Sequence, residues 1–277
     1  MSQIIKIKAR FAGNKSLSDF ATFMLVVTEK IFKYSYNPEN YNESFISDVP
    51  KIETILNPAP EIIYIFWTGE NEMSEQRKKS IQTLEKKSNV KVQVVSPDNV
   101  GAYIKPAFPL HPAYNYLSLV HKSDYLRCYF MLHYGGGYSD VKACRKSWKA
   151  SFNKLNNGKY YALGYREILG GVATLDKKNG KIRYDVKRYY FKTLGVCSFI
   201  FKPNSPIAEE WMCELNRRLD ILQDDLIRNP GNIWGDNSGY PVPWNFILSQ
   251  IIHPLFLKYS EFLLMDEDVR PIFKNYR

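Results

Sequence analysis

Cysteine and histidine are scarce in this sequence, with four of each among 277 residues. The cysteines are Cys128, Cys144, Cys197 and Cys213, and they form neither a CxxC pair nor a Cys/His spacing typical of a zinc site. We therefore expect free thiols in a reducing compartment, and neither a disulfide framework nor a structural zinc site.

Long apolar runs are also missing. The longest lies near FATFMLVV at 20–27, far short of the roughly 20 residues that span a bilayer. The first residues, MSQIIKIKARFAGNK, lack the apolar core and the cleavage site of a signal peptide. We expect a soluble, cytoplasmic protein with no transmembrane segment.

Positive charge and aromatic residues are abundant. The 38 Lys and Arg against 28 Asp and Glu give a net charge of +10, and aromatic residues make up 15% of the chain. A basic surface suggests an anionic partner, namely nucleic acid, a phosphorylated small molecule or a membrane. No GxGxxG follows the first predicted strand, which argues against a dinucleotide oxidoreductase.

Apolar patterning predicts a β-α-β-α-β unit at 61–143. Gly135 stands where a helix would end in a left-handed residue. This alternation favours an α/β fold with a mainly parallel sheet flanked by helices, with ligands beyond the carboxyl ends of its strands. The predicted elements are strands at 61–69, 90–95 and 137–143 and helices at 75–87 and 114–134.

The rest of the chain is more mixed, and one domain, 1–277, is expected. It would comprise a helical N-terminal extension (1–60), a nucleotide-sugar-binding half (61–145) and an acceptor-side half (146–277). Further predictions are a helix at 16–34, an irregular segment at 35–60, strands at 159–165 and 194–202, a hairpin turning at Asn179-Gly180, a helix from Pro206 with Ser205 as N-cap, and a long loop at 229–245 that is either a lid or disordered.

The stretch HKSDYLRCYFMLHYGGGYSDVKACRK at 121–146 holds the strongest functional signal. Asp124 and Arg127 are three apart on a helix and share a face. Asp140 and Lys142 are two apart on a strand and also share a face. The glycines between them allow close backbone approach to a ligand. The plainer interpretation of Asp124 and Arg127 is a surface ion pair of little energetic value.

This stretch resembles the S-D-x-x-R…Y-G-G-x-Y-x-D-x-D segment of nucleotide-sugar glycosyltransferases with the GT-A fold. Within that fold it is most similar to the capsular-polysaccharide synthesis proteins and glycosyltransferase family 32, and it resembles the glucosylating clostridial toxins more distantly. Upstream, IIYIFWTG is similar to that family's first strand, which ends in F/I-W-x-G. The segment YPVPWNFILSQIIHPL also resembles glycosyltransferases of large algal viruses, including a xylosyltransferase.

The resemblance implies a nucleotide-sugar donor, a UDP-sugar or more narrowly UDP-xylose, and a glycan acceptor. Trp67 would stack on the base, and Asp124 and Arg127 would bind ribose and sugar hydroxyls. Asp140 matches the first aspartate of the family motif, which contacts the sugar and helps to hold a divalent ion. Lys142 stands where the family has its second aspartate, the main metal ligand.

The implied site is larger than this core. The donor-binding residues it implies are Trp67, Thr68, Asp124, Arg127, Gly136, Tyr138, Asp140 and Trp234; the catalytic residues are Asp140, Lys142 and Asp236; the metal ligands are Asp140 and His253. Each has a structural alternative. Trp67 has a core residue as its second interpretation, whereas His253 in SQIIHPLF is more often a core residue than a ligand. Asp236 is more often a turn residue, and the basic run at 177–192, which could meet an anionic acceptor, is more often a solvated hairpin.

Three functions follow from the sequence: a glycosyltransferase, a non-catalytic relative that binds nucleotide or glycan, and a basic nucleic-acid-binding protein. The third lacks any helix-turn-helix, RRM or zinc signature, so we expect no nucleic-acid partner. Mn²⁺ or Mg²⁺ stays open as a cofactor, while Lys142 argues against a strong requirement.

Overall fold

The computed structural model describes residues 33–55 and 57–274. In this part of the chain, six strands form one sheet in the order β2-β1-β3-β5-β4-β6. Strand β5 runs antiparallel to β3 and β4, while the other three pairings are parallel. The predicted α/β class with a mainly parallel sheet is confirmed. The strands are β1 (Ile62–Phe66), β2 (Lys91–Val95), β3 (Gly136–Ser139), β4 (Ala162–Arg166), β5 (Leu194–Phe201) and β6 (Leu263–Met265).

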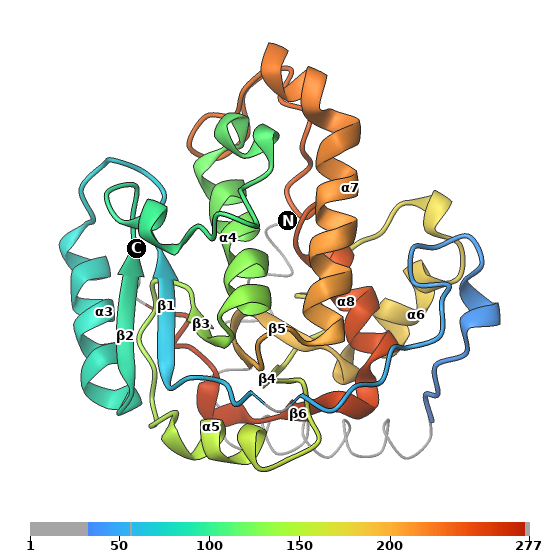
Figure 1. Ribbon diagram of the computed structural model, residues 1–277, viewed down its shortest axis with the longest axis horizontal. Coiled ribbons are helices and arrows are strands. Elements are labelled where there is room, and N and C mark those ends of the chain that lie inside the picture. Colours follow the sequence, from blue (N-terminus) through green and yellow to red (C-terminus); the bar gives the residue numbers. More distant parts are fainter. Residues whose placement is uncertain (1–32, 56, 275–277) are drawn as a thin grey trace.

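Helices cover both faces of the sheet, and Figure 1 shows two of them, α4 and α7, side by side along one face. The α-helices are α3 (Glu75–Ser88), α4 (Leu119–His133), α5 (Lys149–Asn156), α6 (Ile182–Arg188), α7 (Pro206–Arg228) and α8 (Ser249–Lys258). Short 3-10 turns occur at Pro38–Tyr41, Val100–Tyr103, Pro112–Tyr116, Lys177–Asn179, Tyr190–Lys192, Ser260–Phe262 and Glu267–Val269. None of the helices described has the length and apolar character needed to cross a bilayer.

The apolar run of β1 is buried on both faces because its side chains alternate between two cores. Ile63 and Ile65 pack into a core with Ile81 and Leu84 of α3 and with α5. Tyr64 and Phe66 pack into the larger core formed with α4, α7 and α8. The aromatic ring of Phe66 stacks on that of Tyr138, with centroids 5.6 Å apart. This packing fixes β1 and β3 side by side, so that their ends lie together.

Helix α4 begins at Leu119, five residues later than predicted. Ser118 is its N-cap, and the Ser118 hydroxyl accepts a hydrogen bond from the His121 N–H at 3.2 Å. Residues Pro112–Tyr116 form a 3-10 turn instead. At the other end, Gly135 has φ +62°, which confirms the predicted left-handed residue.

Two other predictions are wrong. Asn179 and Gly180 do not turn a hairpin: Lys177–Asn179 is a 3-10 turn and Ile182–Arg188 is helix α6. The buried residues of α6 are Ile182, Asp185 and Val186. This spacing is helical, but the basic residues around them make it hard to recognise in the sequence. The third strand also ends at Ser139, so Asp140 and Lys142 follow it and are not part of it. The predicted helix at 16–34 lies almost wholly outside the described residues.

Candidate functional site

The carboxyl ends of three parallel strands meet at one edge of the sheet. Strand β1 is the middle of the three and pairs in parallel with β2 and with β3. Trp67 and Thr68 follow β1, Ser96 follows β2, and Asp140 follows β3. Parallel strands bring these ends together, and ligands of open α/β sheets bind at such an edge.

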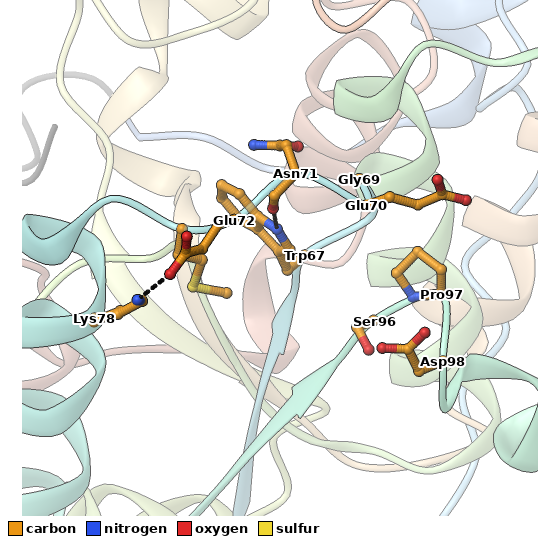
Figure 2. A pocket seen from close by; sticks show the side chains of 10 residues that line it. Trp67, Gly69, Glu70, Asn71, Glu72, Lys78, Ser96, Pro97 and Asp98 are labelled. Carbon is orange, nitrogen blue, oxygen red and sulfur yellow. Dashed lines mark hydrogen bonds and ion pairs between the residues drawn. The ribbon is translucent and has the colours of Figure 1, made fainter.

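A shallow depression of about 330 Å³ opens beside Trp67 at this edge (Figure 2). One wall is the segment after β1, and the other is the turn after β2 that holds Ser96, Pro97 and Asp98. Its full lining is Trp67, Gly69, Glu70, Asn71, Glu72, Met73, Lys78, Ser96, Pro97 and Asp98. An indole ring beside carboxylates and a hydroxyl offers stacking together with hydrogen-bond acceptors, which suits a nucleoside.

Trp67 is partly buried and held in one orientation. Its indole N–H donates to the carbonyl of Asn71 at 2.8 Å, and the guanidinium of Arg77 lies 4.8 Å from its ring centroid. The hydroxyl of Thr68 donates to the carbonyl of Leu119 at 2.6 Å, tying the end of β1 to the first turn of α4. The predicted donor-side residues Trp67 and Thr68 are therefore at the same edge as the start of α4.

Arg127 lies between two carboxylates. Its Nη2 is 3.4 Å from Oδ1 of Asp124 and 3.3 Å from Oδ1 of Asp140. The side chains of Asp124 and Arg127 are 4% and 11% exposed, which excludes a solvated surface pair. Arg127 Nη1 also donates to the carbonyl of Val196 at 3.2 Å, and its guanidinium lies 4.4 Å from the ring centroid of Tyr138. Helix α4 and strands β3 and β5 thus converge on one guanidinium.

Asp140 is the centre of the cluster. The hydroxyl of Tyr138 donates to its Oδ1 at 2.6 Å, and the ammonium of Lys142 pairs with its Oδ2. The backbone N–H of Asp140 donates to the carbonyl of Cys197 on β5 at 2.8 Å. We refer to Asp124, Arg127, Tyr138, Asp140 and Lys142 as the charged cluster; it brings together five of the predicted site residues.

Burial and pairing act in opposite directions on the pKa values of these groups. Burial alone raises the pKa of Asp140, but the charges of Lys142 and Arg127 outweigh it and lower the pKa to about 2. Burial raises the pKa of Asp124, and the nearby Arg127 offsets part of that rise. Burial by itself lowers the pKa of Arg127, but its interactions with Tyr138, Asp124 and Asp140 outweigh burial and raise the pKa above its ordinary value. The cluster therefore holds Arg127 and Asp140 in their charged forms at neutral pH.

Burial also raises the pKa of Cys197 to about 12, with Asp140 adding to the rise. A thiol with so high a pKa stays protonated at neutral pH, so Cys197 is no nucleophile here.

His253, the second predicted metal ligand, lies in the interior of helix α8. Its side chain is fully buried, its Nδ1 accepts a hydrogen bond from the N–H of Ala173 at 2.9 Å, and burial lowers its pKa to about 3. Within residues 33–55 and 57–274, no group of three or more His, Cys, Asp or Glu side chains is arranged to hold a metal ion. The structure places His253 as a neutral core residue, as the plainer interpretation expects.

The predicted loop at 229–245 is irregular throughout and docks on the start of α4. The backbone N–H groups of Leu119 and Val120 donate to the carbonyls of Asn232 and Ile233, each at 3.3 Å. Helix N-termini leave such N–H groups without partners inside the helix, so this loop caps the helix that carries Asp124 and Arg127.

Side chains hold the same loop from within. The hydroxyl of Tyr240 donates to His121 Nδ1 at 2.8 Å, and His121 Nε2 donates to the carbonyl of Trp244 at 3.3 Å. Burial lowers the pKa of His121, which favours the neutral ring that this pattern needs. Gly231 lies so close to α4 that an added Cβ would be 2.5 Å from the Ser118 nitrogen. The sequence did not predict this contact between the loop and α4, because His121 and Tyr240 are 119 residues apart.

The prediction that Gly136 contacts the donor is wrong. It lies at the amino end of β3, where it pairs with Phe201 at the carboxyl end of the antiparallel β5, and so faces the edge opposite Asp140. An added Cβ would lie 2.9 Å from the Ile62 carbonyl oxygen. Close packing against β1, and not approach to a ligand, explains this glycine.

Asp236 and Trp234 lie on the exposed side of the loop. The carboxylate of Asp236 accepts from the Asn232 amide at 2.8 Å, and the Trp234 N–H donates to Asn232 Oδ1 at 3.0 Å. Trp234 is 47% exposed. These contacts make Asp236 a turn residue in this conformation, and they leave the Trp234 ring available to a ligand.

Several acidic residues at the same edge escaped the sequence analysis, among them Asp98 and Glu167. Asp98 lines the depression beside Trp67. Glu167 follows β4, whose carboxyl end lies at the Asp140 edge, and it is buried with 6% exposure. The signal for Asp98 was present, since Ser-Pro-Asp directly follows an apolar strand. Glu167 had no such signal. Strand β4 is connected to β3 through the antiparallel β5, so the sequence does not show that β4 ends at the same edge as β3.

Comparison with known proteins gives a family and two structural likenesses. A family model described as "Capsular polysaccharide synthesis protein" matches residues 14–159, more than half of the chain. A solved structure titled "PaToxG Glycosyltransferase" aligns with TM-score 0.38 and 15% identity over 63% of this chain and 66% of its own. A second, the apo structure of the WbbM bifunctional glycosyltransferase, aligns with TM-score 0.40 and 11% identity over 79% of this chain and 43% of its own. The chain thus spans less than two thirds of either neighbour. Curated protein sequences give no significant match.

Proposed function

The chain belongs to the capsular polysaccharide synthesis protein family, and from this premise we propose that it is a glycosyltransferase that uses a nucleoside-diphosphate sugar. The observation that carries the proposal is the position of the charged cluster. It lies at the same sheet edge as the depression beside Trp67. A nucleotide sugar has a planar base, hydroxyls and a diphosphate, and this edge offers an aromatic ring, carboxylates and cations.

In the proposed complex, the base stacks on Trp67 and the sugar hydroxyls bind at Asp124 and Arg127. Carboxylates accept hydroxyl hydrogen bonds and the guanidinium donates in a fixed geometry, so this pair can orient a polyol. The reaction breaks the bond between sugar C1 and the diphosphate oxygen, and the electron pair stays on the diphosphate. The acceptor hydroxyl oxygen bonds to C1, and its proton is released to the solution.

The proposed donor is a UDP-sugar, with UDP-xylose the narrower candidate, and the proposed acceptor is a glycan hydroxyl. The argument for UDP rests on the analogy of Trp67, at the end of IIYIFWTG, with the base-stacking tryptophan of the glycosyltransferases that this segment resembles.

A thermal-shift screen tests the donor class. UDP, GDP and their sugars, including UDP-xylose, are each added at a hundredfold excess over their dissociation constants. A bound nucleotide should then stabilise the fold by about 2.7 kcal/mol, while adenosine serves as a control for nonspecific stacking. If no nucleoside diphosphate or nucleotide sugar raises the melting temperature, the proposal is wrong.

A second candidate is a relative that binds nucleotide sugars without transferring them, and Lys142 at the second aspartate position favours it. Turnover separates the two. Release of UDP from a UDP-sugar, measured with and without an oligosaccharide acceptor, identifies a transferase. Nucleotide binding without release of UDP identifies the non-catalytic relative.

The loop at 229–245 is proposed as a lid over the donor. Its capping contacts to Leu119 and Val120 and the Tyr240–His121 hydrogen bond connect it to the helix of the charged cluster. Gly235 and Gly239 have φ +71° and +80°, a region that glycine adopts without strain, and they are the proposed hinge positions. Closure of this loop would exclude water from the reacting sugar.

A further inference from the structure

Lys142 is part of the charged cluster and not a surface lysine. Its side chain is 8% exposed, and its ammonium pairs with Oδ2 of Asp140. The ammonium also lies 5.7 Å from the ring centroid of Phe273. The segment around Lys142 is fastened to the last described residues, because Ile272 N–H donates to the Ala143 carbonyl at 2.8 Å and Cys144 forms an isolated bridge with Pro271. The lysine is therefore held in place before any ligand arrives.

Both carboxylate oxygens of Asp140 are engaged by protein groups. Its Oδ1 faces the Tyr138 hydroxyl at 2.6 Å and the Arg127 guanidinium at 3.3 Å. Its Oδ2 faces the Lys142 ammonium. Mg²⁺ and Mn²⁺ bind oxygen-rich, anionic ligand sets. Two carboxylates, one guanidinium and one ammonium give the cluster no net negative charge to attract such an ion.

The residues present therefore do not fit the divalent metal that the family motif implies. A metal at Asp140 would lie against the Lys142 ammonium, whose charge repels it, and His253 is engaged with the Ala173 N–H in the core. The mismatch comes from the side chains that surround Asp140 and from the lysine at the second motif position.

We propose that the Lys142 ammonium replaces the divalent ion and supplies the positive charge that binds the donor diphosphate. This inference rests on the proposed function. A diphosphate entering the edge would share the ammonium with Asp140, and as the C1–oxygen bond breaks, the same ammonium meets the growing charge on the diphosphate. Lysine serves phosphate as a point charge and needs no bidentate geometry.

The first test measures affinity by calorimetry with UDP and with uridine, before and after exhaustive treatment with EDTA. In the wild type we expect equal UDP affinity in both conditions. Lys142→Met keeps the length and removes the charge, so UDP should bind about tenfold more weakly or worse, with uridine unchanged. Lys142→Arg keeps the charge and should recover most of the UDP affinity. Lys146→Met is the matched control, because Lys146 is 66% exposed and pairs with Asp268; it should bind like the wild type.

The second test needs no nucleotide. Lys142→Asp restores the two-aspartate motif, so Mn²⁺ alone should raise the melting temperature of this variant and leave that of the wild type unchanged. Equal stabilisation of both proteins by Mn²⁺ would overturn the inference.

The calorimetry with UDP separates the proposed role of Lys142 from the proposed glycosyltransferase function. UDP binding that EDTA abolishes and Mn²⁺ restores overturns the role of Lys142 and leaves the glycosyltransferase proposal standing. Wild-type UDP affinity in a folded Lys142→Met protein does the same. Absence of UDP and GDP binding in every condition overturns the proposed function, and this inference with it.

Discussion

The guanidinium of Arg127 lies 3.3 Å from the carboxylate of Asp140, so helix α4 and the end of strand β3 meet in one ion pair. Because Arg127 also contacts Asp124 at 3.4 Å, it compensates two carboxylates that are largely removed from water. A buried cation of this kind is costly to lose, since its removal leaves Asp124 without its ion-pair partner and takes one of two cations from Asp140, which keeps Lys142.

Replacing Arg127 with Met should lower the free energy of unfolding by about 3 kcal/mol, the scale for breaking a buried ion pair. The double variant Arg127→Met with Asp124→Asn should recover part of this loss, because one uncompensated charge disappears. Urea denaturation measures both. Arg228→Met is the control: Arg228 and Asp225 have the same helical spacing but are 68% and 51% exposed, so less than about 1 kcal/mol should be lost. Equal losses at the two arginines would contradict a buried role for Arg127.

Trp67→Ala should weaken UDP binding roughly tenfold or more, because stacking of a base on an aromatic ring contributes about 1–3 kcal/mol. Trp67→Phe should retain most of the affinity, since a ring remains. Phe108→Ala serves as the control for loss of a partly exposed ring, as Phe108 is 53% exposed and outside the depression. Unchanged UDP affinity in a folded Trp67→Ala protein would rule out stacking at this position.

Limited proteolysis should cut the loop at 229–245 in the free protein and spare it in the presence of UDP. Tyr240→Phe removes the hydroxyl that bonds to His121, so cleavage of the free protein should be faster in this variant. The cut site is identified by mass spectrometry, and the exposed segment near Ile52, which precedes the amino end of β1, provides an internal reference that UDP should not protect. Equal cleavage of 229–245 with and without UDP would count against a lid.

Stability should fall as the pH is lowered below about 6.5, because burial lowers the pKa of His253 to about 3. Between these values the unfolded chain binds a proton that the folded chain refuses, so the free energy of unfolding decreases by about 1.4 kcal/mol per pH unit from this residue. Burial also lowers the pKa of His133, to about 4, and acts in the same direction.

His253→Asn keeps an acceptor for the Ala173 N–H and removes the titrating ring, so unfolding followed from pH 7 to pH 4 should have a shallower slope. Ile252→Val, a change at a fully buried neighbour, should lower stability at every pH and leave the slope unchanged. A wild-type slope in His253→Asn would show that another group dominates the acid response.

Much of the candidate site could be predicted from the sequence because it depends on local spacing. A spacing of three residues on a helix places Asp124 and Arg127 on one face. An apolar strand followed by Trp67 places that ring at a sheet edge. The family resemblance then joined the two segments, and the match to the capsular polysaccharide synthesis family confirms that part of the resemblance. The Gly135 cap followed from the same local rules.

Other residues could not be placed this way. Gly136 is a glycine in a motif, but whether it faces a ligand or a neighbouring strand depends on β1, which comes 70 residues earlier. From the sequence, His253 fits a metal ligand or a core residue, and the hydrogen bond from the Ala173 N–H to its ring decides for the core. In both cases the deciding contact comes from a distant part of the chain.

By itself, the sequence determined the alternation of strands and helices, the residue types at the sheet edge and the lysine in place of an aspartate. These depend on side-chain periodicity and identity, which are local. The tertiary structure alone decided that Arg127 of α4 pairs with Asp140 as well as with Asp124, and that the loop at 229–245 caps α4. The physical reason is that ion pairs and caps form across elements whose separation in sequence carries no record of their distance in space.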